Sequence, residues 1–269
     1  TNSTESTVIE LRQKVEALAD SNAEIRRKRD KGVAVSGGGT GGSQASGKYA
    51  AALDDPDNLL ESPTKPFIPT DAKEGGTLRR RLSATPKGFN WLTENGADVS
   101  EIQRYVHNQF ARRDAENPDK WTPELAYKIE VSDDFKEYTI HLREGVMWHV
   151  PQNLDLSDPK YDWLKKPREL TAEDAVFYFE MVTNPQVEAG AIKNYYEQLE
   201  SAEVVDKYTF KLTWKNKVRQ SLWASIEVYP LPKWLYTKTQ TGEDIPKETL
   251  GTRFNNHWSN KMSVALGTG

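Results

Sequence analysis

A glycine-rich segment at residues 37–46, GGGTGGSQAS, decides how much of this chain can share one hydrophobic core. Glycine loses more conformational freedom on ordering than any other residue. The segment lacks the Lys-Ser/Thr ending of a phosphate-binding loop, and no apolar strand leads into it. We therefore expect a flexible linker, without regular secondary structure over residues 32–46, between two separately structured parts.

The residues before the linker, 1–31, are predicted to form a helix with a narrow apolar stripe. The stripe follows the alternating spacing of three and four that marks the a and d positions of a coiled coil: Val8, Leu11, Val15, Leu18, Asn22 and Ile25. Three heptads alone are marginal in water. Two interpretations stay open: a frayed helix, or a short stalk that self-associates in parallel through residues 8–25 with Asn22 paired across the interface.

The stretch after the glycines is polar as far as residue 73 and contains Pro56, Pro63, Pro66 and Pro69. This composition predicts an extended segment on a surface, so the expected linker spans residues 32–73. A stalk, a linker and a domain suit a protein held at a distance from a membrane. The sequence begins at Thr1 rather than Met, which a cleaved leader or trimming would explain, and a lipid anchor before Thr1 would fit this layout.

Composition excludes several classes of function. The formal net charge of −4 argues against a general nucleic-acid binder, which needs a basic face to neutralise phosphates. The absence of cysteine excludes disulfides, thiolate catalysis and cysteine-based zinc sites. No apolar run is long enough to span a bilayer. The mean hydropathy of −0.75 is low for a compact domain, so part of the chain is expected to stay unpacked.

Residues 74–269 carry the signals of a mixed α/β domain. Strands are predicted at residues 75–82, 125–131, 138–142, 202–205 and 208–214, and helices at 98–110, 171–183, 222–226 and 232–235. Short turns that contain aspartate, at 132–134 and 206–207, join two of the strand pairs into expected hairpins. Asp98 is placed to cap the helix that it begins.

The helix after residue 170 begins with a capping box, Thr171-Ala172-Glu173-Asp174, and Asn184-Pro185 ends it. The neighbouring carboxylates of Glu173 and Asp174 invite an acid–base interpretation. A solvated first helical turn, where negative charge suits the helix dipole, is the simpler interpretation.

No catalytic or metal-binding pattern stands out, so we expect a protein that is not an enzyme and binds no cofactor. The four histidines, His107, His141, His149 and His257, have no metal-ligand spacing. No Gly-x-Ser-x-Gly elbow is present. Eight tryptophans are many for this length. Several of them could stack on sugars or on peptide aromatic groups, although most are expected in the core: Trp91, Trp121, Trp163, Trp214, Trp223, Trp234 and Trp258.

Five stretches, in order and with consistent spacing, give the chain from residue 75 onward a recognisable pattern. They are residues 123–126 (PELA), 138–148 (YTIHLREGVMW), 170–177 (LTAEDAVF), 205–210 (VDKYTF) and 267–269 (GTG). Together they resemble the extracellular solute-binding proteins of family 5, which carry oligopeptides, dipeptides, nickel complexes and some oligosaccharides. The resemblance implies an α/β fold class, as the N-terminal portion of a two-lobed periplasmic-binding-protein fold of class II type. Trp148 of the second stretch is expected in the core.

The chain departs from the family pattern in two places. A short Asp-Gly turn commonly follows the motif tryptophan in the family, whereas this chain has residues 149–169 there. We interpret this insertion as a surface embellishment, with packing on a neighbouring lobe or an added contact surface as alternatives. The sequence also stops at residue 269, where the family's chain crosses between lobes. The resemblance therefore implies a fragment whose principal ligand anchors lie beyond residue 269.

The resemblance also implies a ligand held in a cleft between lobes, with candidate contacts in three places on this chain. They are Trp91, Asn95 and Gly96 in the loop after the first strand, Tyr195 and Tyr196 after the helix at 171–183, and Gly267 and Thr268 at the hinge edge. For each of these residues, packing or turn geometry is the competing explanation.

The implied function is that of the substrate-binding component of an ABC-type importer, with peptides as ligands and the importer's membrane subunits as partners. The implied location is the periplasm or the extracellular face of the membrane. The isolated chain is then expected to bind free peptides very weakly, because one lobe leaves a ligand half solvated. The alternative is a carbohydrate-binding or carbohydrate-active extracellular surface module, which the tryptophan count and the tethered layout would allow.

Overall fold

The computed structural model describes residues 42–64, 79, 81–94, 96–151, 154–218, 220–260, 264 and 266–268. The chain divides between residues 46 and 47 into two units. The second unit contains all the described residues except 42–46, and the account below concerns this unit. The helix expected at residues 1–31 lies outside the described residues, as does most of the strand expected at 75–82.

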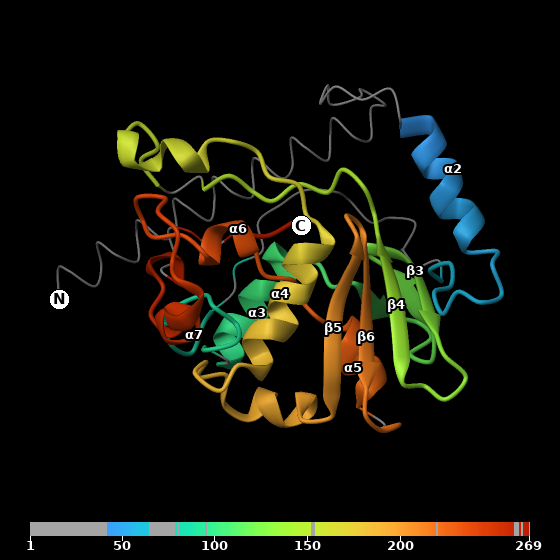
Figure 1. Ribbon diagram of the computed structural model, residues 1–269. Helices are drawn as coiled ribbons and strands as arrows, with labels where there is room; N and C mark the ends of the chain where they lie inside the picture. Colours follow the sequence, from blue (N-terminus) through green and yellow to red (C-terminus); the bar gives the residue numbers. More distant parts are fainter. Residues whose placement is uncertain are drawn as a thin grey trace. The chain divides into compact units, whose positions relative to one another are not determined.

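A four-stranded antiparallel sheet, in the order β3-β4-β6-β5, forms one side of the unit (Figure 1). Its strands are β3 (Ala126–Val131), β4 (Glu137–Leu142), β5 (Leu199–Asp206) and β6 (Thr209–Trp214). The β3–β4 and β5–β6 pairs confirm both predicted hairpins. The central strands β4 and β6 alternate between buried and more exposed residues, which is the period that places one face of a strand on a core.

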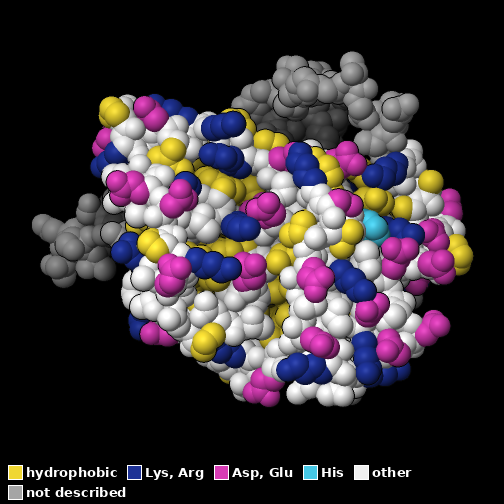
Figure 2. Space-filling model, in the orientation of Figure 1, with side chains coloured by type: hydrophobic (Ala, Val, Ile, Leu, Met, Phe, Trp, Pro, Cys, Tyr) yellow, Lys and Arg dark blue, Asp and Glu magenta, His cyan; other side chains and the backbone are white. Residues whose placement is uncertain are grey.

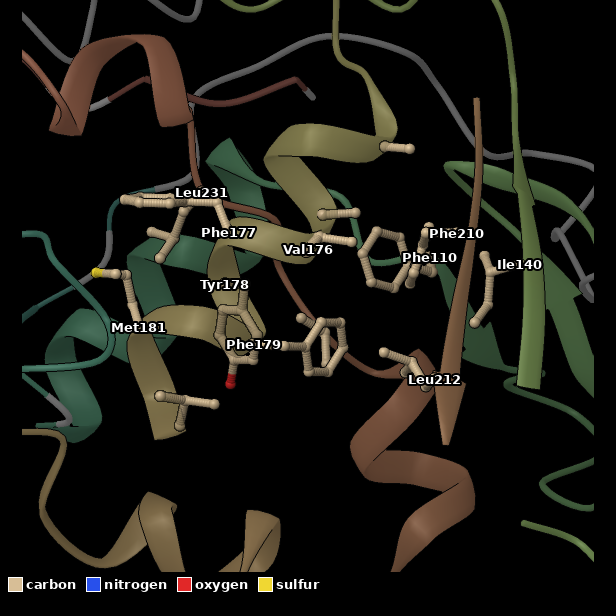
Figure 3. Close-up of a cluster of buried hydrophobic side chains, with 14 of the residues drawn as sticks. Phe110, Ile140, Val176, Phe177, Tyr178, Phe179, Met181, Phe210, Leu212 and Leu231 are labelled. Atoms are coloured by element: carbon tan, nitrogen blue, oxygen red, sulfur yellow. The ribbon is translucent and has the colours of Figure 1, made fainter. Parts of the chain in front are cut away.

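Helix α4 (Ala172–Thr183) packs against this sheet and is buried almost all round. Figure 3 shows side chains of α4 that point in opposite directions: Val176 and Phe179 toward β6, and Phe177 and Met181 toward Leu231. The ring centroids of Phe179 and Phe210 are 6.2 Å apart. A helix that is apolar on all sides belongs inside a domain, and α4 is the centre of the main core.

Shorter elements complete the unit. They are α3 (Ala97–Val106), α5 (Ser221–Ile226), α6 (Lys233–Tyr236), α7 (Lys247–Asn255) and the 3-10 helices η1 (Pro159–Leu164), η2 (Gly190–Tyr196) and η3 (Trp258–Asn260). A two-stranded antiparallel sheet, β1 (Ala111–Arg113) and β2 (Trp121–Pro123), was not predicted. On the face shown in Figure 2, acidic and basic side chains are interspersed rather than gathered by sign.

Helix α3 ends four residues earlier than predicted. It ends at Val106, and Phe110, placed by the sequence on the apolar face of the helix, instead enters the core with no exposed surface. Asp98 does not cap the helix, since its carboxylate accepts hydrogen bonds from the Ser83 and Ala84 backbone amides, at 3.0 and 2.9 Å. The strand predicted over 75–82 is also wrong where it can be compared: residues 79, 81 and 82 have no strand structure.

Helix α2 (Gly42–Ala52) replaces part of the expected linker. The prediction of irregular structure over 32–46, and of extended chain after it, is therefore wrong for residues 42–52. Three consecutive alanines at 50–52 favour helix strongly. Contacts from distant parts of the sequence then fix the helix: the Tyr49 ring lies 5.0 Å from that of Tyr127, and Lys48 forms a 3.1 Å ion pair with Glu144.

The chain directly after α2 forms turns at residues 53–54 and 56–57, so the predicted extended structure is wrong there too. The stretch that follows is not confined to the surface. The Leu59 amide donates to the Ile129 carbonyl and the Glu61 amide to the Trp121 carbonyl, both at 2.8 Å. Between them, Leu60 is 1% exposed and belongs to the main core. This segment therefore covers the β3 edge of the large sheet.

Candidate ligand-binding site

Three of the predicted ligand residues, Trp91, Gly267 and Thr268, meet around the C-terminal end of α3. The Trp91 ring centroid lies 4.2 Å from that of His107, the residue that follows the helix. The Thr268 hydroxyl donates to Asn108 Oδ1 at 3.4 Å. Residues far apart in the sequence thus form one continuous wall.

Gly267 sits so close to α3 that no other residue fits. A Cβ atom built on it would lie 1.8 Å from the Val106 carbonyl oxygen. On its other side, the His149 amide donates to the Gly267 carbonyl at 2.9 Å, and the Gly267 amide donates to His149 Nδ1 at 3.3 Å. The chain at Gly267 is therefore fixed between the end of α3 and the start of the insertion.

The wall is aromatic and electrically neutral at pH 7. Tyr229 adds a third ring, with its centroid 6.3 Å from Trp91 and 5.9 Å from His107. Burial, and to a smaller extent the nearby His149, lower the pKa of His107 to about 3, so the imidazole is uncharged. Burial raises the pKa of Tyr229, which keeps the phenol protonated. Such a surface can contact apolar groups and amides but holds no charged ligand group by itself.

The space behind this wall is too small for a ligand. Trp91, His107, Tyr236 and Ser259 line a cavity of about 10 Å³, which is close to the volume of a single water probe. The indole N–H of Trp91 is buried there without a hydrogen-bond partner among the described residues. Trp91 and His107 are themselves only 8% and 7% exposed. A ligand would therefore meet the wall mainly at Asn108, Tyr229 and Thr268, which are half-buried.

The other predicted residues that the structure describes do not join this wall. Gly96 precedes α3 at its other end, about 15 Å along the helix axis by the rise per residue. Tyr195 is exposed and packs its ring 4.9 Å from that of Trp223. Asn95 lies outside the described residues.

The prediction for Tyr196 requires correction. The side chain is 5% exposed, and its hydroxyl bonds to the Tyr178 hydroxyl at 3.2 Å and donates to the Ala224 carbonyl at 3.1 Å. Burial raises the pKa of this phenol well above its usual value. Tyr196 is a core residue with no surface left for a ligand.

Sequence reasoning missed His107, Asn108 and Tyr229 as members of the wall. The predicted helix ran through residues 107 and 108, which hid the fact that they follow its end. Tyr229 comes just before the Pro-Leu-Pro stretch at 230–232, a break in regular structure that could have marked it.

Asp174 is a buried anchor and not part of a solvated turn, so the earlier interpretation is corrected. It accepts hydrogen bonds from Trp148 Nε1 at 3.1 Å and from the backbone amides of Thr171 at 3.1 Å and Lys233 at 2.8 Å. The Thr171 bond confirms the predicted capping box. Desolvation outweighs these donors and raises the pKa of Asp174 to about 6. Trp148, 3% exposed, is in the core as predicted.

No catalytic or metal centre emerges from the described part of the chain. It contains no group of three or more His, Cys, Asp or Glu side chains that could hold a metal ion. The helices of the same part of the chain are too short or too polar to cross a membrane. The arrangement around Trp91 can bind but offers no assembled nucleophile and base.

Comparison with known proteins gives one family and several relatives. The model of the bacterial extracellular solute-binding proteins, family 5 (middle), matches residues 120–258. The dipeptide-binding protein of Escherichia coli is 37% identical over 116 residues, which covers 41% of this chain and 19% of that protein. Heme-binding protein A of Haemophilus influenzae is 28% identical over 178 residues, or 61% of this chain and 30% of that protein.

A solved structure shows the fold. The oligopeptide-binding protein AppA of Bacillus subtilis, in complex with a nonapeptide, superposes with a TM-score of 0.51 at 19% identity. The superposition covers 68% of this chain and 31% of that chain. The expected fold class is therefore confirmed. The chain spans less than a third of the length of each of these three proteins.

Proposed function

The chain belongs to the bacterial extracellular solute-binding proteins of family 5, and on this premise we propose that it supplies part of one ligand-binding lobe of an ABC importer's substrate-binding component. The match of the family model over residues 120–258 carries the proposal, since this region contains most of the main core, the insertion and Tyr229. The proposed location is the periplasm or the extracellular face of the membrane, and a lipid anchor before Thr1 belongs to the same proposal.

Peptides are the proposed ligands. Relatives of the chain are named as dipeptide-binding and di/tripeptide-binding proteins. The half-buried residues of the wall around Trp91 suit this class, because Tyr229 offers an aromatic ring while Asn108 and Thr268 offer neutral hydrogen-bonding groups. Charged peptide termini would need partners elsewhere, since the wall is neutral.

The complete gene product gives the direct test of this function. Mass spectrometry of ligands that co-purify with it should detect short peptides, and calorimetry with a mixed dipeptide and tripeptide pool should detect binding. Tyr229→Ala should weaken that binding about threefold to tenfold, because an aromatic contact at such a wall contributes roughly 0.5–1.5 kcal/mol. Trp223→Ala, which removes a ring that packs on Tyr195, serves as the matched control.

The isolated 269-residue chain should bind the same pool very weakly, because cleft binders bury a ligand between two closing lobes. Tight, stoichiometric binding by the isolated chain would contradict this part of the proposal. Sugars or nickel complexes in place of peptides in the mass spectra would overturn the ligand class while leaving the binding function intact.

Self-association through residues 8–25 is a separate proposal. It rests on the heptad spacing and on Asn22 at an a position. Analytical ultracentrifugation of the chain, with and without residues 1–31, tests it. A monomer at every accessible concentration would contradict it.

A further inference from the structure

The insertion at residues 149–169, called the arm below, is packed onto the molecule rather than projecting from it. Figure 1 shows it beside α6, on the side of the unit away from β3 and β4. Trp163 contacts two other indoles nearly edge to face, with centroids 6.2 Å from Trp234 and 5.9 Å from Trp258. Its indole N–H donates to the Gln240 carbonyl at 3.3 Å.

The loop that receives the arm is shaped for it. Gly242 has a φ of +87°, a conformation that side chains disfavour. A Cβ atom at Gly242 would lie only 2.9 Å from the Trp163 ring. Tyr161 accepts a hydrogen bond from Gln240 Nε2. The arm and this loop are therefore matched to each other in shape.

The arm also holds the segment that carries Gly267, at two independent points. Tyr161 and Leu164 share a small apolar cluster with Leu235 and Leu266, and Leu266 is 3% exposed. One residue further along, Gly267 makes its two hydrogen bonds to His149 at the beginning of the arm. An apolar contact and a backbone pair thus fix consecutive residues.

These contacts connect the arm to the wall around Trp91. Gly267 lies against the Val106 carbonyl at the end of α3, and Thr268 bonds to Asn108 just after it. His107, between Val106 and Asn108, packs its ring at a tilted angle on that of Trp91. A displacement of residues 266–268 would therefore shift the residues of the wall as well, because a close-packed interior transmits strain.

We propose that the arm is a positioning element for this wall: Trp163 and His149 hold Leu266–Thr268 against α3 and so keep the ligand-contacting residues in one arrangement. The proposal rests on the proposed function for its ligand-binding part only. Trp163 is a positioning residue, since it does not itself lie at the wall.

Amide hydrogen exchange on the 269-residue chain tests the mechanical part without any ligand. Trp163→Ala should speed exchange at Leu266 and Gly267 at least tenfold and leave the amides of β4 and β6 unchanged. Trp163→Phe, which keeps a ring in the same place, should restore most of the protection. Trp223→Ala, also a half-buried tryptophan but outside the arm's cluster, should leave Gly267 unaffected.

Unchanged exchange at Gly267 in Trp163→Ala would overturn the proposal. So would equal acceleration across β4 and β6, because the arm would then only add general stability. If Trp163→Ala does not fold, His149→Ala replaces it, since that change removes one hydrogen bond to Gly267 and keeps the aromatic cluster.

Peptide affinity of the complete gene product tests the second part. Trp163→Ala should weaken binding about 5- to 50-fold, with Trp163→Phe close to wild type. Faster exchange at Gly267 with unchanged affinity would overturn the link to the wall. Failure of the wild-type protein to bind peptides would instead count against the proposed function, and exchange at Gly267 would still decide whether the arm holds Leu266–Thr268.

Discussion

The main core around α4 and the small cluster under the arm are built in different ways. The main core comes from periodic elements, with β4, β6 and α4 each presenting a regular apolar face. The arm's cluster comes from short helices of one or two turns, and its aromatic side chains, Tyr161, Trp163, Trp234 and Trp258, meet from η1, α6 and η3. We infer that a substitution in the main core lowers the free energy of unfolding of the whole unit. A substitution near the arm should instead change the structure only around the arm.

Phe210→Ala should give the largest effect. Phe210 has no exposed surface and packs its ring 5.0 Å from that of Phe110. Removing a buried phenylalanine ring costs about 3–5 kcal/mol, so the free energy of unfolding should fall by that amount. Urea unfolding followed by circular dichroism measures it, and Phe135→Ala, at an exposed ring, is the matched control. A change below 1 kcal/mol at Phe210 would break the comparison.

Acidification should give the next largest change in the free energy of unfolding, because buried titratable groups lie in both regions. Burial lowers the pKa of His107 to about 3 and that of His257 to about 4, so their contribution to stability is full above pH 6.5 and is lost as the pH falls. Asp174 acts in the opposite direction: its pKa, raised to about 6, adds stability as the pH falls from 6 toward 3.8.

Between pH 6.5 and 4.5 these three groups together should reduce the free energy of unfolding by about 2–3 kcal/mol. Urea titrations at a series of pH values measure the slope. His257→Gln should flatten it, and Asp174→Asn should make it steeper, because each removes one of the opposing contributions. A pH-independent stability over this range would contradict the buried neutral state of the histidines.

Gly267→Ala should give a smaller and local effect. The added Cβ would overlap the Val106 carbonyl, and relief requires the chain to move away from α3. Overpacking of this kind costs about 1–3 kcal/mol. Exchange should accelerate at the end of α3 and at Leu266, with β4 and β6 unchanged. Gly145→Ala is the control, because an added Cβ there has open space around it but the residue has a positive φ. Its effect shows the cost of backbone strain without a steric overlap.

Lys48→Ala should give the smallest effect. Both partners of the Lys48–Glu144 ion pair are about half exposed, and exposed pairs contribute about 0–1 kcal/mol. The midpoint of thermal unfolding should change by no more than a few degrees at low salt, and by less at high salt. A loss above 2 kcal/mol would mean that α2 belongs to the main core energetically.

The difference between the two regions also explains what the sequence could predict. The hairpins and the capped helix depend on alternation and capping between neighbouring residues, so local pattern was sufficient to place them. Trp91, Gly267 and Thr268 were found through the family resemblance, but their meeting point at His107 was not, because it depends on where α3 ends. Asp174 looked solvated for a similar reason: its donors Trp148 and Lys233 lie 26 and 59 residues away.

The errors at α2 and Leu60 have the same origin. Polarity and prolines predicted extended surface chain over 47–73, and the alanines at 50–52 alone would not sustain a helix. What decides the outcome is contact with Tyr127, Glu144 and the β3 edge, and none of these is near in sequence. The arm is a further case, since a loop with three prolines gave no sign of the cluster around Trp163.

The unequal edges of the large sheet bear on how the protein avoids aggregation. The segment around Leu60 shields the β3 edge, while β5, at the other edge, pairs only with β6 among the described residues. Open edges invite strand addition by another molecule. Along β5, Glu200, Glu203 and Asp206 are exposed. A second copy that added its own β5 would bring carboxylates close to carboxylates. The β3 edge is thus protected by the segment that covers it, and the β5 edge by repulsion between like charges.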